Sequence, residues 1–330
     1  MDSRLILLLS LVASGVAALC SGWLDPYYYD VCISIGINII LAVSLNLVNG
    51  YTGQFSLGHA GFMAVGAYTS ASITNALAVK FTGMPIGAAE VVFVLALFLG
   101  GLAAAIAGLA VGIPSLRLRG DYLAIVTLGF GEIIRVLILN MDFLGAARGL
   151  SVTWHNTNFF WTFGLASFAV YVVYNLVHST YGRGFVTVRD DEIAAEAVGI
   201  NTTKYKVIAF ATAAFFAGLA GGLYAHYKQY LTPEGFNFFK SVDIVVMVIL
   251  GGMGSTAGVV AAAIILTLLP ELLRMLSHLP WIPEPVQPWL ENRLILYSLL
   301  LIILMLTRPQ GLFGNVEFLR KFMAARRAGK

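Results

Sequence analysis

The chain has 330 residues, of which 59% are hydrophobic and 11% are charged, and its mean hydropathy is +0.84. Soluble domains are about 45–50% apolar and about 25% charged, so this composition excludes an ordinary soluble protein and indicates a polytopic helical membrane protein. The formal net charge of +3 says little as a total, because the placement of Lys and Arg matters more. Cys20 and Cys32 are too few for a thiolate metal site, although they could pair with each other.

Apolar windows of about 20 residues mark the expected membrane spans. They cover residues 5–23, 31–48, 57–79, 86–113, 122–140, 162–178, 205–227, 242–275 and 294–307. The first could instead be a cleaved signal peptide, because Arg4 precedes a leucine-rich stretch. The residue before Cys20 is not the small one expected next to a lipidated cysteine, so we treat residues 5–23 as a span.

Small and amide side chains form a stripe along the second span. Ser34, Asn38, Ala42, Asn46 and Asn49 follow one another at spacings that place them on one helical face. Such side chains pack and hydrogen-bond between membrane helices, which is one interpretation. The other is a stripe that faces a hydrated path, and the sequence leaves both open.

A glycine-rich stretch over residues 49–59 separates the second and third spans. Inside a bilayer a helix loosens only where protein or a water-filled cavity covers the break, and in transporters such breaks lie beside paths for polar solutes. We expect this break on a translocation path that includes Gly50, Gly53, Gln54, Ser56, Gly58 and His59, together with Asn38 and Asn46. For His59 we expect a hydrogen bond that fixes the broken backbone, since a proton relay would need further ionisable groups in series.

The fifth span carries Glu132 and Arg135, which are three residues apart and can pair across one helical turn. Asp121 lies about three turns before Glu132 on the same face. Charged groups at membrane depth usually face the bundle interior. A structural ion pair is the simpler interpretation, and a part in gating or in guiding a zwitterion along the path is the alternative.

Residues 190–199, between the sixth and seventh spans, predict a short amphipathic helix outside the membrane. Asp190 is the expected N-cap, Asp191 and Glu192 suit the positive helix start, and Gly199 is placed to end the helix. Apolar residues share one face, while Glu192 and Glu196 lie on another. A helix of this length is not stable alone, so it docks either on the protein's own membrane ends or in a groove of a soluble partner.

The segment 242–275 is too long for one crossing and contains a second glycine-rich stretch, residues 250–258. We expect two short helices here, with Gly251, Gly252 and Gly254 also on the path. The chain is therefore predicted to be an all-α membrane protein with about ten transmembrane segments, including two broken or half-length helices.

Basic residues set the expected orientation. The tail 308–330 holds six basic residues and one acidic residue, and the segment 181–206 and the loop with Arg117 and Arg119 are also basic. Because cytoplasmic loops carry an excess of Lys and Arg, ten segments would place both loops and both termini in the cytoplasm.

Five motifs together resemble the permeases of branched-chain amino acid ABC importers, and the M-type (LivM-type) subunit in particular. They are residues 46–68, 117–135, 191–201, 251–258 and 308–314, in this order along nearly the whole chain after the first span. The resemblance implies a type II-like ABC importer permease fold over residues 1–330, a single transmembrane permease domain with a coupling-helix loop at 179–206 and a basic cytoplasmic tail at 308–330. It also implies a location in the bacterial inner membrane.

The resemblance further implies a subunit without its own motor. Family members pair with a second homologous permease chain and two ATP-binding subunits that carry ATP-Mg, and a periplasmic protein delivers leucine, isoleucine or valine. The short helix is similar to a coupling-helix motif, which implies contact with the ATPase through Asp190, Asp191, Glu192, Ala194, Ala195, Glu196, Gly199 and Asn201. Ile193 departs from that motif, where an alanine often stands. We expect the chain to contact membrane lipid. We expect no cofactor, metal or nucleic acid for it.

Other classes of protein fit the sequence less well. There is no Gly-x-x-x-x-Gly-Lys-Ser/Thr phosphate loop and no nucleophile beside a base, so neither an ATPase nor an intramembrane enzyme is expected. In an ion-coupled secondary transporter, the predicted docking helix at residues 190–199 would have no role. Related permeases carry urea, short amides or other amino acids, and no residues in the spans define a side-chain pocket.

Overall fold

The computed structural model describes residues 25–80, 86–115 and 121–277, with isolated positions between 7 and 18 and between 298 and 306. The spans expected at 5–23 and 294–307, the loop with Arg117 and Arg119, and the tail 308–330 lie wholly or largely outside these residues. The described elements are α2 (Pro26–Asn46), η2 (Leu47–Tyr51), α3 (His59–Lys80), α4 (Ile86–Ser115), α5 (Asp121–Leu139), η3 (Asp142–Leu144), η4 (Ala146–Arg148), β1 (Leu150–Ser151), α6 (Phe159–His178), α7 (Gly182–Asp190), α8 (Glu192–Ala197), α9 (Thr202–Lys228), β2 (Tyr230–Leu231), η5 (Pro233–Phe236), α10 (Phe238–Gly251) and α11 (Thr256–Ser277).

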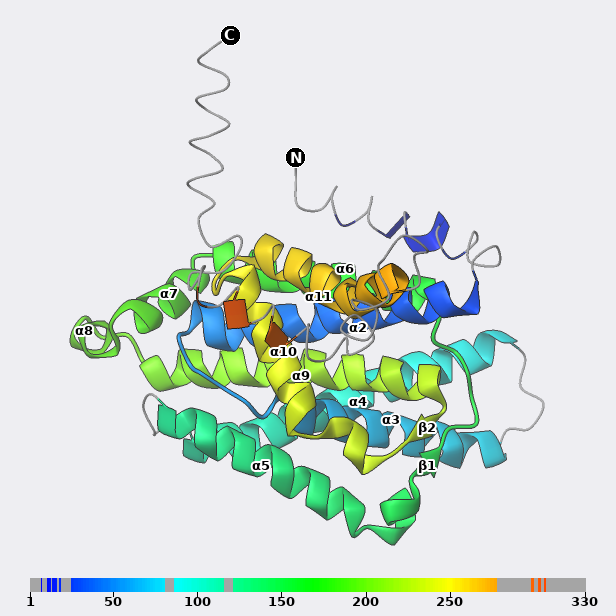
Figure 1. Cartoon of the computed structure of the whole chain (residues 1–330). Helices are drawn as coiled ribbons and strands as arrows, with labels where there is room; N and C mark the ends of the chain where they lie inside the picture. Colours follow the sequence, from blue (N-terminus) through cyan, green and yellow to red (C-terminus); the bar gives the residue numbers. More distant parts are fainter. Residues whose placement is uncertain are drawn as a thin grey trace.

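The long helices run side by side between two ends of a bundle (Figure 1). The helices α7 and α8 project from one end, where α4 also finishes and α5 begins, and the strands β1 and β2 mark the opposite end. The helix ends that flank the loop with Arg117 and Arg119 therefore lie on the same side as residues 179–202. This arrangement agrees with the prediction that the two basic loops share one side of the membrane.

Six described helices are long and apolar enough to cross a membrane. They are Pro26–Tyr51, Ala89–Ser115, Tyr122–Leu139, Phe159–His178, Thr202–Lys228 and Thr256–Met275. The predicted division of residues 242–275 is confirmed, because α10 ends at Gly251 and α11 begins at Thr256, but the expectation of two short helices is wrong for α11, which has 22 residues. At 14 residues, α10 is the half-length helix, and it crosses the front of the bundle obliquely from the α5 side to the α11 side (Figure 1).

Small residues bring α3, α4 and α9 into close contact. A Cβ added to Gly66 would lie 2.2 Å from the Gly218 Cα, and one added to Gly221 would lie 2.0 Å from the Met63 carbonyl oxygen. Membrane helices gain packing energy mainly where small side chains let the backbones approach. These three helices therefore form a tightly packed block, which we call the scaffold.

A short strand pair, which the sequence did not predict, ties loops together at the end opposite to α8. Leu150 and Ser151 pair antiparallel with Leu231 and Tyr230. The side chain of Asn75, near the end of α3, donates to the Ser151 carbonyl at 2.7 Å. The loop after α5 and the connection between α9 and α10 are thereby held to the scaffold.

Candidate functional site

The first glycine break is a folded, buried connection. After α2 the chain makes one π-helical turn, η2, and then continues without regular structure to His59. Asn49 Oδ1 accepts the Ser56 N–H at 3.1 Å, while Thr52 Oγ1 and the Gln54 N–H both donate to the Val48 carbonyl. These bonds give partners to backbone groups that leave the helix inside the bundle, as burial away from water requires.

The second break packs directly against the first. Gly254 N–H donates to Asn46 Oδ1 at 2.9 Å, and the Tyr51 hydroxyl lies 2.8 Å from Thr256 Oγ1. A Cβ added to Gly50 would lie only 2.3 Å from the Gly254 nitrogen, so a side chain at Gly50 would separate the two breaks. Gly252 and Gly254 have φ values of 92° and 85°, which favour glycine.

Arg189, the penultimate residue of α7, lies between the two breaks. A Cβ added to Gly53, whose φ is 67°, would lie 3.0 Å from Arg189 Cγ, and one added to Gly254 would lie 3.2 Å from its Nη1. The Arg189 Nε and Nη2 atoms donate to Asp190 Oδ1 at 3.0 and 2.9 Å. One side chain therefore contacts both breaks and the turn that leads into α8.

A polar cavity of about 290 Å³ adjoins this contact. Its walls are residues 52–55, Leu123, residues 188–192 and Lys206. The Gln54 side chain is only 5% exposed, and its amide has no hydrogen-bond partner among the described residues. The loop of the first break and the α7–α8 turn thus enclose polar space between them.

The helix α8 is capped at both ends. Asp191 Oδ1 accepts the Ile193 and Ala194 N–H groups at 2.9 and 3.0 Å, so the N-cap is Asp191 and the prediction of Asp190 was wrong. Gly199, with φ 84°, ends the helix as predicted, because the N–H groups of Gly199 and Ile200 bond back to the Glu196 and Ala195 carbonyls.

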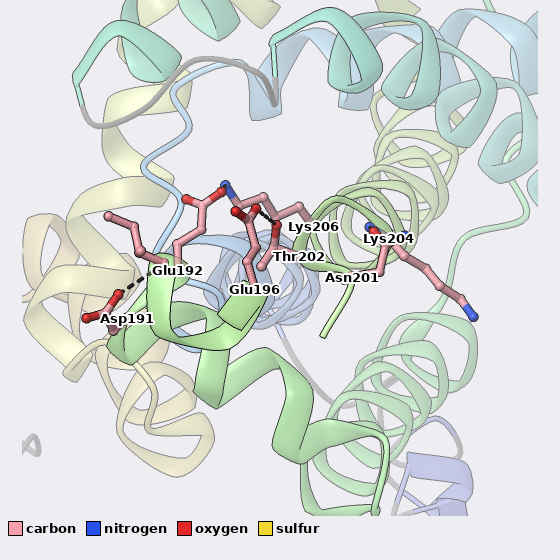
Figure 2. A network of polar contacts seen from close by, with 8 residues as sticks. Asp191, Glu192, Glu196, Asn201, Thr202, Lys204 and Lys206 are labelled. Carbon is pink, nitrogen blue, oxygen red and sulfur yellow. Dashed lines mark hydrogen bonds and ion pairs between the residues drawn. The ribbon is translucent and has the colours of Figure 1, made fainter. Parts of the chain in front are cut away.

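Acidic residues of α8 fasten it to α9 (Figure 2). Glu192 pairs with Lys206 at 2.6 Å, and Glu196 accepts the Thr202 hydroxyl at 2.8 Å. Asn201 caps α9 by accepting the Lys204 N–H at 3.0 Å. The acidic face therefore docks on the protein's own α9, as one of the two predicted interpretations required.

The apolar edge of α8 remains uncovered within the described chain. Ile193 is 67% exposed and Val198 is 74% exposed, whereas Ala195 is buried. Exposed large aliphatic side chains on a short, rigidly held helix outside the membrane spans are typical of a protein interface. The described contacts thus leave the second interpretation, insertion into a partner groove, available for this edge.

The remaining predicted residues lie apart from this end-of-bundle cluster. His59 Nε2 lies 2.9 Å from Ser44 Oγ and is buried, so it fastens the start of α3 to α2 as expected. Glu132 and Arg135 pair at 2.7 Å on α5 and are partly exposed, which confirms the predicted ion pair. Asn38, half-way along α2, bonds Thr267 of α11 and Lys240 of α10, so this part of the stripe joins helices.

Sequence reasoning missed two sets of residues. It took Arg189 only as part of a basic loop, and it did not foresee that Lys240 and Asp243 lie half-buried on α10. Lys240 and Asp243 lie at the edge of an apolar window, three residues apart, and that spacing is the signal that could have indicated an intramembrane charged face.

A bundle of long apolar helices with buried, protein-covered breaks defines a multi-pass α-helical membrane protein. Comparison with known proteins gives its family. The chain belongs to the family described as branched-chain amino acid transport system / permease component, which matches residues 27–305.

Three relatives support this assignment. The chain is 34% identical over 319 residues to the high-affinity branched-chain amino acid transport system permease protein LivM of Salmonella typhimurium strain LT2, a match that covers 86% of this chain and 69% of the relative. The protein of the same name from Escherichia coli strain K12 matches with the same identity and coverage. A probable LivM of Methanocaldococcus jannaschii is 26% identical and covered over 90% of its length. No solved structure matches this chain.

Proposed function

We propose that this chain is a permease subunit of an ATP-driven ABC importer that moves leucine, isoleucine and valine across the bacterial inner membrane. The family match over residues 27–305 is the observation that carries the proposal. The substrate class follows from the names of the relatives, which are branched-chain amino acid permeases. Residues 1–330 form one permease domain with both termini in the cytoplasm.

The proposed partners are a second homologous permease chain, two ATP-binding subunits that hold ATP-Mg, and a periplasmic amino acid binding protein. The chain's lack of a phosphate loop supports a separate motor. The exposed edge formed by Ile193 and Val198 supports a soluble partner at α8, the coupling helix of this proposal. The loop 179–206 is then the coupling loop.

The contacts of α7 and α8 support a mechanism of alternating access. A motor that pushes on α8 would also move Arg189, because the two lie on either side of one short turn. Arg189 contacts Gly53 and Gly254, so its displacement would change how the two breaks fit together. If the contact between the two glycine breaks has two alternative arrangements, one would open the translocation path to the periplasm and the other to the cytoplasm.

The proposal is tested by reconstituting the chain with its partners in proteoliposomes. Leucine uptake should require both ATP and the binding protein, and it should persist when ionophores remove proton and sodium gradients. A double variant, Glu196→Lys with Gly199→Leu, should hydrolyse ATP without importing leucine, because α8 loses its bond to Thr202 and its C-terminal turn. Uptake driven by an ion gradient without ATP, or full uptake in the double variant, would refute the proposal.

A further inference from the structure

The ammonium group of Lys240 is half-buried and reaches the middle of the α2 span. Lys240 Nζ donates to Asn38 Oδ1 at 3.2 Å, and Asn38 Nδ2 donates to Thr267 Oγ1 at 2.9 Å. Asn38 is at the middle of the span Pro26–Tyr51, and Thr267 is at the middle of α11. At a rise of 1.5 Å per residue, both ends of the α2 span are about 20 Å from this group.

Lys240 differs from the other buried or half-buried cations of the described chain. Lys206 and Arg135 each have a carboxylate oxygen at 2.6–2.7 Å. Among the described residues, no carboxylate oxygen lies within 4.0 Å of Lys240 Nζ. An ammonium has three donors, and one of them bonds a neutral amide here.

An intramembrane charge without a paired opposite charge is costly and usually faces a water-filled cavity or a functional pathway. The surroundings of this point carry charges of both signs. The helix α10 begins at Phe238, two residues before Lys240, so its positive N-terminal end adds to the charge of Lys240. Asp243 follows one turn later, is half-buried, and its charge interacts with that of Lys240.

The surface of α4 provides a contrast. Apart from Glu90, near its beginning, the exposed side chains described for α4 are apolar, with Val94, Phe98 and Ile106 among them. That surface suits lipid. The start of α10 carries a cation and an anion three residues apart, which lipid tails cannot solvate.

We propose that Lys240 and Asp243 form a mid-membrane site for the backbone charges of a zwitterionic amino acid in transit. This inference rests on the proposed function and names the part of the path that contacts the substrate. The α-carboxylate is placed at Lys240, and the α-ammonium at Asp243. Such a site binds what all amino acids share, so selection among leucine, isoleucine and valine belongs to other residues or to the delivering protein.

The test is thiol labelling of the assembled transporter in proteoliposomes. In a background with Cys20→Ser and Cys32→Ser, Lys240→Cys and Asp243→Cys are exposed to membrane-impermeant charged methanethiosulfonates. The matched control is Ile106→Cys, whose position is 64% exposed on the lipid-facing α4. We expect modification at 240 and 243 at least tenfold faster than at 106, and at least threefold slower modification at 240 when leucine-loaded binding protein and ATP are added.

A second measurement separates binding from structure. Lys240→Gln should lower leucine uptake at least tenfold at unchanged membrane abundance, and Lys240→Arg, which keeps the charge, should recover most of the loss. The proposal is overturned if Lys240→Cys stays unmodified in the assembled complex but reacts in the isolated chain, since a partner carboxylate would then cover it. It is also overturned if Lys240→Gln transports normally.

The two proposals fail in different ways. If the complex imports no leucine, isoleucine or valine while position 240 labels and is protected by another amino acid, the substrate assignment fails and the site stands. If the complex imports leucine while position 240 never labels, the function stands and the site fails.

Discussion

The scaffold and the region of the two glycine breaks hold their helices together by different means. In the scaffold of α3, α4 and α9 the backbones touch, and an added methyl group at Gly66 or Gly221 would overlap a neighbour. At the breaks Gly50 also packs closely against Gly254, and directional bonds from Asn46, Asn49 and Tyr51 add to that contact. Such bonds contribute about 1 kcal/mol each and can be exchanged for others, whereas close packing allows no alternative partner. The comparison indicates a fixed support beside a part that can rearrange.

The largest effect is expected from filling the scaffold. Gly66→Leu should greatly lower the amount of protein in the membrane. The Cβ of the new leucine alone would overlap Gly218, and overpacking lowers the free energy of unfolding by about 1–3 kcal/mol or more. The measurement is membrane abundance by immunoblot. Gly129→Leu on α5, where nothing lies within 4 Å, is the matched control and should accumulate normally. Equal abundance of the two variants would show that the scaffold is not closely packed.

A smaller change in abundance but a loss of transport is expected at the breaks. Gly53→Val places a branched side chain at φ 67° against Arg189, so the break should lose its contact with α7 while the scaffold remains intact. Leucine uptake in proteoliposomes should fall at least tenfold, with assembly retained on a sizing column. Gly129→Val is the control. Normal uptake by Gly53→Val would argue against any role of this contact in transport.

The smallest effect is expected at the ion pair of α5. Glu132 and Arg135 are both partly exposed, and in the structural interpretation the pair only neutralises two charges within the span of α5. Arg135→Gln should therefore leave leucine uptake within about twofold of the parent. A tenfold loss at normal abundance would instead support the gating role that the sequence left open.

The sequence predicted the spans well and the contacts between them poorly. Long apolar windows define helices in a bilayer because every backbone group must be bonded within its own segment, so the long described helices were found to within about five residues, and six of them are long and apolar enough to span. The glycines of residues 250–258 likewise indicated the division between α10 and α11. Both patterns, the apolar windows and the glycine-rich stretch, depend on residues that are neighbours in the sequence. They therefore predict local structure without knowledge of the tertiary contacts.

The missed features depend on tertiary structure. The helix α7 contains Gly182 and Gly184, which disfavour helix, and it is held by ring contacts of Tyr181 and Phe185 with Tyr205 on α9. Asp190 and Asp191 are equally good caps by residue type, and Arg189 bonds the first and leaves the second to cap α8. Nothing near Lys240 in the sequence shows that it would reach Asn38 on another helix.

The bond between Asn46 and Gly254 has a consequence for biosynthesis. Its two ends are 208 positions apart in the chain, so the carboxamide of Asn46 has no access to this partner until Gly254 has left the ribosome. During that interval the surface beside Gly50 is uncovered, and a nascent chain halted after α9 keeps it so. Because Gly254 lies between α10 and α11, the last long helices of the described chain, the junction of the two breaks is among its last contacts to form during synthesis.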